Sequence, residues 1–444
     1  MKRRSFLKNT GITAAGALAA PYVLPSGRLF APSGRQIAGH VVVVMFAGGV
    51  RQQESVGMRY LDDSQVGDPY PGNILTNMLT GEAPTQKIVY GTGQGGQTPI
   101  PQLLDQTLQQ QGTLFKEIRA LSAGHFGGLN SIVQGSTVTT QGLKQRPLNP
   151  TIFEYLRRHG GYSATDTWFI GNGISNSLPL LNFSAHQDYG SSYGANFFAP
   201  QITFGAKCAE YMADAKVYHP ENELAPMYQL KYFLDQSFDN YDEGLLALGN
   251  TEEEKQNIKA FMDQMYEKTA NGTVAFPPIL EGSDSVTMGY ACEVLKWFKP
   301  AVLFVNLSGV DGCHSNFTNY LQAMHRADHA VGHLWDFIQN EIPDMAGDTT
   351  LILTPECGRN DNPNNIIDEN NWRSYDHSDE NSLRVFSMMA GPDVPSNLII
   401  GSEDNQIGQV TDTMMTVADI LGVLPEVQAA GFTASGTQSL FNHI

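Results

Sequence analysis

Cysteines are few in this sequence, and they are widely spaced. Among 444 residues there are four, and no two of them form a Cys-x-x-Cys pair: Cys208, Cys292, Cys313 and Cys357. This spacing excludes a zinc ribbon and a thioredoxin-like redox motif. Cys313 and Cys357 each stand beside polar residues, and they would be able to pair if the fold brought their two loops together.

Basic residues are also scarce. The chain has 27 Lys and Arg against 45 Asp and Glu, which gives a formal net charge of −18. Nucleic-acid binding requires a basic face, so this composition argues against it, and it equally opposes binding to anionic lipids. There is no internal repeat or low-complexity tract. The length and ordinary apolar content instead predict a soluble globular protein with a large core.

The chain also lacks a long, strongly apolar run. Residues 2–8 read KRRSFLK, a twin-arginine pattern, and a weakly apolar Ala/Gly-rich stretch follows at residues 11–20. That stretch is too short and too weakly apolar for a membrane anchor, and no lipobox cysteine follows it. We therefore predict a twin-arginine signal peptide and linker at residues 1–37, and a periplasmic or secreted protein with no membrane anchor.

The sequence does contain apolar runs of strand length that alternate with helical patterns. Residues 40–46 (HVVVVMF), 302–305 (VLFV) and 348–354 (DTTLILT) are rich in β-branched residues without period-2 alternation, as in buried parallel strands. Helical spacing is found at 151–159, 251–268, 285–298 and 316–342. The pattern predicts an α/β domain at 38–444 with a doubly wound, mostly parallel sheet flanked by helices. A largely helical inserted cap or subdomain is expected at 186–285.

Polar residues directly follow these predicted strands, at the edge where open α/β sheets bind ligands. The candidates, in chain order, are His125, Asp311, His314, Glu356, Arg359 and His377. Carboxylates and imidazoles at such an edge suit a metal or acid/base site. Two other interpretations are open at this point. Asp311 would cap the next helix while His314 merely packs, and Arg359 would be a surface residue paired with Asp361 or Glu356.

Three histidines on the helix predicted at 316–342 form a regular series. His325, His329 and His333 recur at every fourth residue, so they share one face of the helix. A metal-binding stripe is conceivable, but the spacing favours a partly exposed polar face.

The order of the motifs resembles the alkaline phosphatase and sulfatase-like superfamily, in particular its twin-arginine-exported branch labelled DUF1501. The resemblance spans most of the mature chain, is weak from 60 to 120 and is absent from about 186 to 285. The matching segments are Gly48-Gly49 after the first strand, His125 ahead of Gly135, Asp311 with His314, residues 327–332 (ADHAVG), residues 354–360 (TPECGRN), Asp376-His377, and residues 419–422 (DILG).

This resemblance implies two metals that flank a Ser or Thr nucleophile. The ligand positions of one metal look like Asp311, His314 and His377. For the second metal, the first ligand position falls on Ala47, which cannot ligate, and an Asp-His pair is replaced by Glu356-Cys357. The nucleophile position falls near His125. The Cys-x-Pro/Ala-x-Arg motif of formylglycine sulfatases is absent, which excludes that mechanism.

We therefore expect one divalent ion, most simply a zinc-like one, held by Asp311, His314, Glu356 and His377. His125 is expected to act as a ligand or base rather than as a nucleophile, and Arg359 to hold a phosphate or sulfate group bidentately. The predicted function is an exported metal-dependent hydrolase of small anionic phosphate or sulfate esters, with an altered, metal-depleted site.

Two alternatives to this function stay open on the sequence. The first is a catalytically degenerate relative of the same fold that binds a ligand or partner without turnover. The second is a structural envelope protein whose polar loops only stabilise turns.

Overall fold

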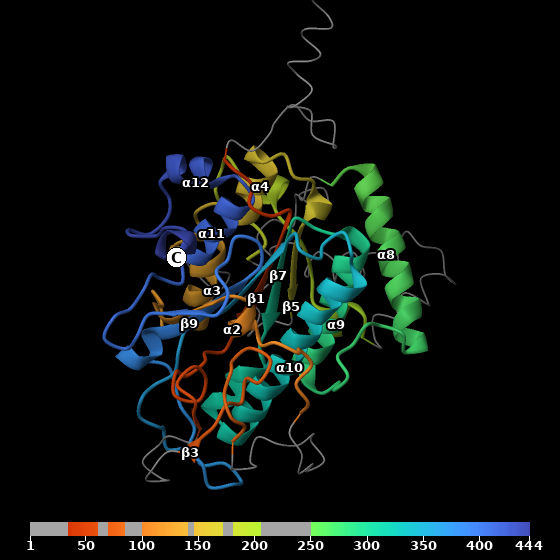
Figure 1. Cartoon of the computed structure of the whole chain (residues 1–444). Helices are drawn as coiled ribbons and strands as arrows, with labels where there is room; N and C mark the ends of the chain where they lie inside the picture. Colours follow the sequence, from red (N-terminus) through yellow and green to blue (C-terminus); the bar gives the residue numbers. More distant parts are fainter. Residues whose placement is uncertain (1–33, 61–69, 85–99, 141–145, 172–180, 206–249) are drawn as a thin grey trace, which may run out of the picture.

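The computed structural model of the chain describes residues 34–60, 70–84, 100–140, 146–171, 181–205 and 250–444 (Figure 1). Nearly all of the predicted signal peptide and linker lies outside these ranges. The same is true of residues 206–249, the middle of the predicted insertion. In the ranges described, no helix has the length and apolar character needed to cross a membrane.

The strands that build the main sheet are β1 (His40–Phe46), β4 (Thr113–Arg119), β5 (Thr167–Gly171), β6 (Asn196–Phe198), β7 (Val302–Leu307), β8 (Thr349–Pro355), β9 (Arg384–Ala390) and β10 (Leu398–Ile400). They lie in the order β10-β4-β9-β8-β1-β7-β5-β6. The short strands β2 (Arg59–Tyr60) and β3 (Tyr70–Pro71) pair separately. Among the described strands of the main sheet, β9 alone runs antiparallel to its neighbours. The mostly parallel α/β sheet predicted from the sequence is therefore confirmed.

The central strand β1 explains why the apolar runs do not alternate. Val42, Val44 and Phe46 pack into the apolar cluster on one face of the sheet, while Val41 and Val43 pack into the cluster on the other face. Because helices cover both faces, every second position is buried as deeply as its neighbours.

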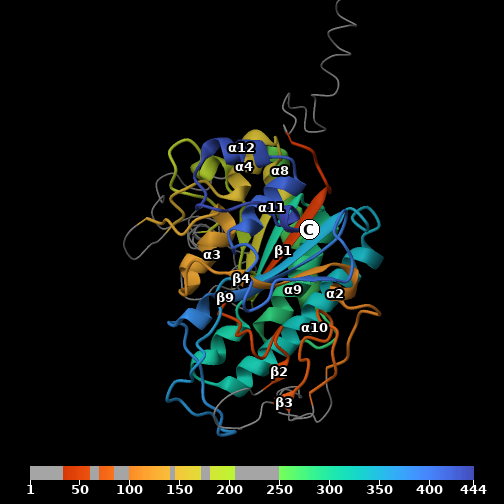
Figure 2. The ribbon, with the colours of Figure 1, turned by 60° about the vertical axis from the view of Figure 1, so that its left-hand side comes forward.

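The helices are α2 (Leu108–Gln111), α3 (His125–Gln134), α4 (Ile152–His159), α5 (Pro200–Thr203), α8 (Glu252–Asn271), α9 (Gly282–Phe298), α10 (Phe317–Glu341), α11 (Asp412–Ile420) and α12 (Leu424–Ala430). One face of the sheet carries α9 and α10, with α8 outside them, and the other carries α3, α4, α11 and α12 (Figures 1 and 2). Capping boxes at Thr151 and Thr251 begin α4 and α8.

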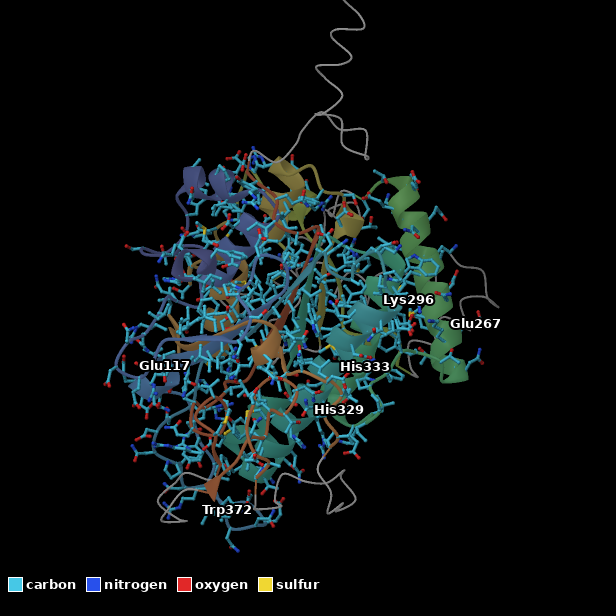
Figure 3. All side chains as sticks on the ribbon, in the orientation of Figure 1. Glu117, Glu267, Lys296, His329, His333 and Trp372 are labelled. Atoms are coloured by element: carbon cyan, nitrogen blue, oxygen red, sulfur yellow. The ribbon has the colours of Figure 1, made fainter. Side chains whose placement is uncertain are left out.

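The three regularly spaced histidines of α10 correct one expectation. His325 and His329 are each only 2% exposed, and Figure 3 shows His329 and His333 along the helix. The three rings pair with the backbone carbonyls of Ile74, Pro101 and Ala275 respectively. The prediction of a partly exposed polar face is therefore wrong for the first two. They are buried because segments near residues 74 and 101 cover this side of the helix.

One strand lies within the range predicted as an insertion. β6 pairs in parallel with β5 and extends the main sheet at its edge. Residues 196–198 are therefore part of the sheet itself. The assignment of the rest of 186–285 as a cap or subdomain stays a prediction.

Candidate metal site

The loops that follow β1, β7 and β8 converge at the carboxyl edge of the sheet. Gly48 and Gly49, directly after β1, have φ angles of +125° and +76°. A Cβ on Gly48 would lie 2.6 Å from the Cα of Asp311, and one on Gly49 would lie 2.7 Å from the carbonyl oxygen of Gly358. The two glycines thus allow the three loops to approach more closely than side chains would permit.

Glu356 is the buried anchor of this junction. Its carboxylate is fully buried and accepts the backbone N–H of Gly48 at 2.6 Å and that of Gly49 at 3.4 Å. One of its oxygens lies 2.8 Å from Nδ1 of His125, the first residue of α3. Glu356 therefore fixes the start of α3 against the loop that follows β1.

His125 stands between two carboxylates. Its Nδ1 faces Glu356, and its Nε2 lies 3.1 Å from Oδ1 of Asp311. Burial alone would lower the pKa of His125, but the hydrogen bonds to Asp311 and Glu356 outweigh it and raise the pKa to about 9. Without a bound metal the ring is charged at neutral pH, and an ion that binds here must displace a proton.

His314 and His377 complete a group of three imidazoles. The ring of His377 lies 4.1 Å from that of His125 and 4.8 Å from that of His314, centroid to centroid. Burial, with the neighbouring charges of His125, Arg359 and His314, lowers the pKa of His377 to about 4. Its Nδ1 is buried and meets no hydrogen-bond partner in the described part of the chain. A neutral ring with an unpartnered nitrogen is the form that ligates metals.

Two overlapping sets of side chains at this junction have the spacing of metal ligands. In each set the ligand atoms lie within 4.8 Å of one another: His125, His314 and His377 in the first, and His125, Glu356 and Cys357 in the second. Asp311 Oδ1 lies 3.6 Å from His314 Nε2, so it can join the first set. Three imidazoles and a carboxylate fit a zinc-like ion.

The sequence-predicted site residues thus meet at one place, although Arg359 is placed differently from either expectation. Its side chain is fully buried, so it is not a surface arginine paired with Asp361 or Glu356. It donates to the carbonyl oxygens of Gly48, Gly49 and Tyr375 and pairs with Asp311 at 3.2 Å. These contacts hold the loops together and orient Asp311, so we assign Arg359 to positioning.

Two residues of the site, Asp376 and Cys357, were not among the residues predicted to form it. Asp376 Oδ1 lies 2.8 Å from Nδ1 of His314, and the Asp376-His377 pair was its only signal. Cys357 Sγ lies 3.6 Å from Nδ1 of His125. Cys357 and Cys313 are both free, buried thiols, so the disulfide considered from the sequence is not formed. Burial raises the pKa of the Cys357 thiol well above its usual range.

No protein-family model and no curated protein matches the sequence. Among solved structures, the chain is similar to a protein of the alkaline phosphatase superfamily from Vibrio parahaemolyticus, with 15% identity over 91% of this chain and 71% of that chain and a TM-score of 0.42. It is also similar to the PsFucS1 sulfatase from Pseudoalteromonas sp., with 12% identity over 90% of this chain and 73% of that chain and a TM-score of 0.41. A third similar structure is a Mg-bound variant of the alkaline phosphatase of the Antarctic bacterium TAB5, with 10% identity over 87% of this chain and 98% of that chain and a TM-score of 0.40. At these values, none of the three proteins decides the activity of this chain.

Proposed function

We propose that this chain is an exported, metal-dependent hydrolase of phosphate or sulfate esters whose site holds a single zinc-like ion. The observation that carries the proposal is the group of three imidazoles at the carboxyl edge of the sheet, in which the buried Nδ1 of His377 has no partner in the described residues. We infer that His125, His314, His377 and Asp311 bind the ion, and that Glu356 supports them.

A bound ion of this kind would polarise an ester oxygen and lower the pKa of a water molecule. The chain's own carboxylates orient the imidazoles. Glu356 takes the Nδ1 side of His125 and Asp376 takes the Nδ1 side of His314, so that the Nε2 atoms of both rings face each other at 3.5 Å. Carboxylate–histidine pairs of this type fix the tautomer and orientation of metal ligands.

The position after β1 favours one ion over two. Ala47 is fully buried and carries no donor atom, so the first strand contributes no side-chain ligand. A second ion would have to be held by Glu356, Cys357 and His125, and the last of these already belongs to the first set. The same loss supports a second candidate function, a degenerate relative that binds an anionic ligand without turnover.

The test measures metal content and ester hydrolysis together. We expect elemental analysis of the purified chain to find one transition-metal ion per chain, and His377→Ala to reduce it to near zero. The matched control is His186→Ala, which removes a histidine that accepts a local backbone hydrogen bond from Asp188. Hydrolysis of p-nitrophenyl phosphate or p-nitrophenyl sulfate is expected to fall about 100-fold in His377→Ala, a typical loss for a disrupted metal site.

Three other outcomes would favour the alternative function or contradict the proposal. Metal without turnover on either ester would favour the ligand-binding alternative. No metal after reconstitution with zinc would contradict the proposed site altogether, and two ions per chain would contradict the single-ion assignment.

A further inference from the structure

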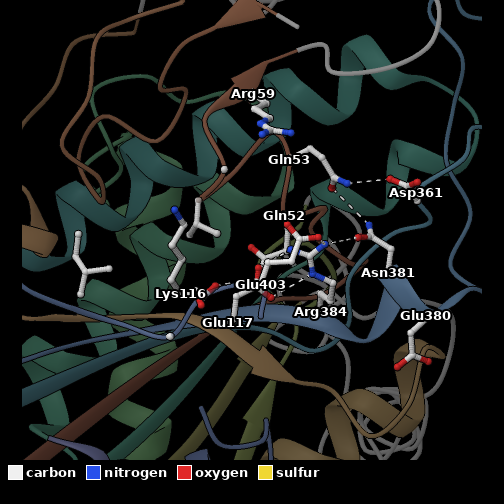
Figure 4. Close-up of a pocket in the computed structure, with 15 residues that line it drawn as sticks. Gln52, Gln53, Arg59, Lys116, Glu117, Asp361, Glu380, Asn381, Arg384 and Glu403 are labelled. Carbon is white, nitrogen blue, oxygen red and sulfur yellow. Dashed lines mark hydrogen bonds and ion pairs between the residues drawn. The ribbon is translucent and has the colours of Figure 1, made fainter. Parts of the chain in front are cut away.

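A second feature of the carboxyl edge is a pocket of about 790 Å³ that none of the clustered histidines lines (Figure 4). Its walls come from the segment 52–59 after β1, from Lys116 and Glu117 of β4, and from residues 380–384 and 399–403. A volume of this size accommodates a small organic ligand.

The pocket lies beside the proposed metal site along the same edge of the sheet. Because β9 is antiparallel, its first residue, Arg384, stands at the edge where β4 and β8 end. In the strand order, β9 is next to β8, the strand that directly precedes Glu356, so the pocket and the metal site are neighbours along this edge. Asn381 of the pocket wall donates to the carbonyl oxygen of Arg359 at 2.7 Å, so the two sites share a wall.

A β-bulge directs two side chains of β4 into this pocket. The pairing with β9 runs from Phe115↔Ser387 to Ile118↔Val385, so β4 has one extra residue at this point. Bulges bend a strand locally and re-aim its side chains, and they are frequent beside functional sites. The two residues between the paired positions, Lys116 and Glu117, both line the pocket.

Most charges of the pocket are already paired within the protein. Glu117 is buried and receives Arg384 through two bonds, of 2.6 and 3.2 Å, and Arg384 also binds Glu403 at 2.9 Å. Lys116 differs, because its ammonium group makes no hydrogen bond or ion pair with the residues that the structure describes. In Figure 4 it lies on the opposite side of the pocket from Asp361 and Glu380.

Gln52 offers a second unused group next to Lys116. Its side chain is 4% exposed and its Nε2 donates to the backbone carbonyl of Lys116 at 3.1 Å. Its Oε1, however, is buried and has no partner among the described residues. An unpartnered buried amide oxygen is costly, so it is the mark of a group that a ligand or water completes. The lining of one pocket thus contains both a cation and an acceptor that have no partner among the described residues.

We propose that this pocket binds a hydroxylated organic anion of the sugar-acid type, with the anionic group on Lys116 and a hydroxyl on the Oε1 of Gln52. The ammonium of Lys116 supplies the charge, and the amides of Gln53 and Asn381 line the wall for further hydroxyls. Val56 and the half-exposed Ile399 offer apolar contact for the CH face of a ring. The inference rests on the proposed function in one respect: the bound molecule is the non-reacting part of the ester substrate.

Calorimetric titration of the purified full chain with sodium D-glucuronate tests the proposal, because this molecule has the charge and hydroxyls but no ester bond. We expect glucuronate to bind at least about tenfold more tightly than D-glucose, which lacks the charge. In the Lys116→Met variant we expect the two molecules to bind equally tightly. Lys116→Arg, which keeps the charge, is expected to stay within about threefold of the wild type. Lys259→Met, an exposed lysine on α8, is the matched control and should change nothing.

The same titration on His377→Ala separates this inference from the proposed function. That variant is expected to lose the metal but to bind glucuronate as the wild type does. Glucuronate binding that is no tighter than that of glucose, or that survives Lys116→Met unchanged, would overturn the pocket assignment. Binding lost in His377→Ala but kept in Lys116→Met would place the anion on the metal site instead, and would also overturn it.

Discussion

His125 is the residue on which the candidate site depends most directly. Its two ring nitrogens face Glu356 and Asp311, which come from the loops after β8 and β7, while its backbone begins α3. One side chain therefore joins three parts of the chain that are far apart in sequence. His125 also belongs to both possible sets of metal ligands. An ion bound by one set therefore leaves the other set with one ligand fewer.

The first prediction concerns Gly48. Its backbone conformation is one that residues with a side chain rarely adopt, and the neighbouring atoms leave no space for a Cβ. Gly48→Ala would place a Cβ 2.6 Å from the Cα of Asp311 at a φ of +125°, so the loop after β7 must move. We expect a loss of about 3 kcal/mol or more in the free energy of unfolding, and loss of the bound metal. Chemical unfolding followed by tryptophan fluorescence, together with elemental analysis, measures both.

Gly272→Ala is the matched control for this prediction. Gly272 also has a positive φ, of +66°, but an added Cβ would meet nothing within 4 Å. It should cost only about 1–2 kcal/mol, the price of the left-handed conformation itself. Equal losses in the two variants would show that the crowding at Asp311 has no effect.

At the scale of elements, α10 is held to the segments beside it by its buried histidines. His325 pairs through Nδ1 with the carbonyl oxygen of Ile74 at 2.8 Å and accepts the N–H of Ile100 at its Nε2 at 3.2 Å. This arrangement requires the neutral ring, because a proton on Nε2 would face the N–H of Ile100. Burial lowers the pKa of His325 below its ordinary value of 6.5, with smaller contributions from the charges of His329 and Arg326.

The direction of that pKa shift sets a pH dependence. As the pH falls below about 6.5, the unfolded chain takes up the proton first, so this contribution to stability is present at higher pH and is lost on acidification. Asp284 and Asp328, whose pKa values burial raises to about 6, act in the opposite sense. The difference between the wild type and His325→Gln isolates the histidine.

We expect the wild type to lose stability relative to His325→Gln between about pH 7.5 and pH 5. Urea unfolding of both proteins across this range gives the two curves. Curves that stay parallel at every pH would contradict the assignment of His325 as a buried neutral ring.

The long, regular elements were predictable from sequence, and the short ones were not. β1, β7 and β8 have apolar runs that both faces of the sheet bury, so the runs themselves mark the strands. By contrast, β6 and β10 have three residues each, too few for any periodicity to show. The histidines of α10 were misjudged for a related reason: the periodicity of a helix does not reveal which other segments cover its polar side.

For the candidate site, the sequence was sufficient to nominate residues but not to assign their contacts. His314, Glu356 and His377 follow strands or lie in loops at the same edge, and the parallel sheet brings such residues together. The burial of Arg359 and the contact between Cys357 and His125 depend on how the loops after β1 and β8 pack. No pattern along the chain contains that information.

For the whole molecule, export is the feature that rests on sequence alone. The Arg3-Arg4 pair with Phe6-Leu7 predicts a twin-arginine route, which carries proteins already folded. Replacing both arginines by lysine should leave a folded precursor in the cytoplasm, detectable by cell fractionation and immunoblotting. Lys2→Gln, which alters the charge but keeps the arginine pair, serves as the control. Normal export of the double variant would contradict the prediction.

The reversed strand β9 has a consequence for how such a protein can diversify. Because it brings Arg384 to the edge where parallel strands end, one wall of the pocket comes from β4, β9 and the segment after β10, which supply none of the metal-site residues, while the opposite wall belongs to the segment after β1. Substitutions or insertions in the wall from β4, β9 and β10 would alter which molecules are recognised and leave the metal ligands in place. Selection can therefore act on recognition and on chemistry separately, within one continuous sheet.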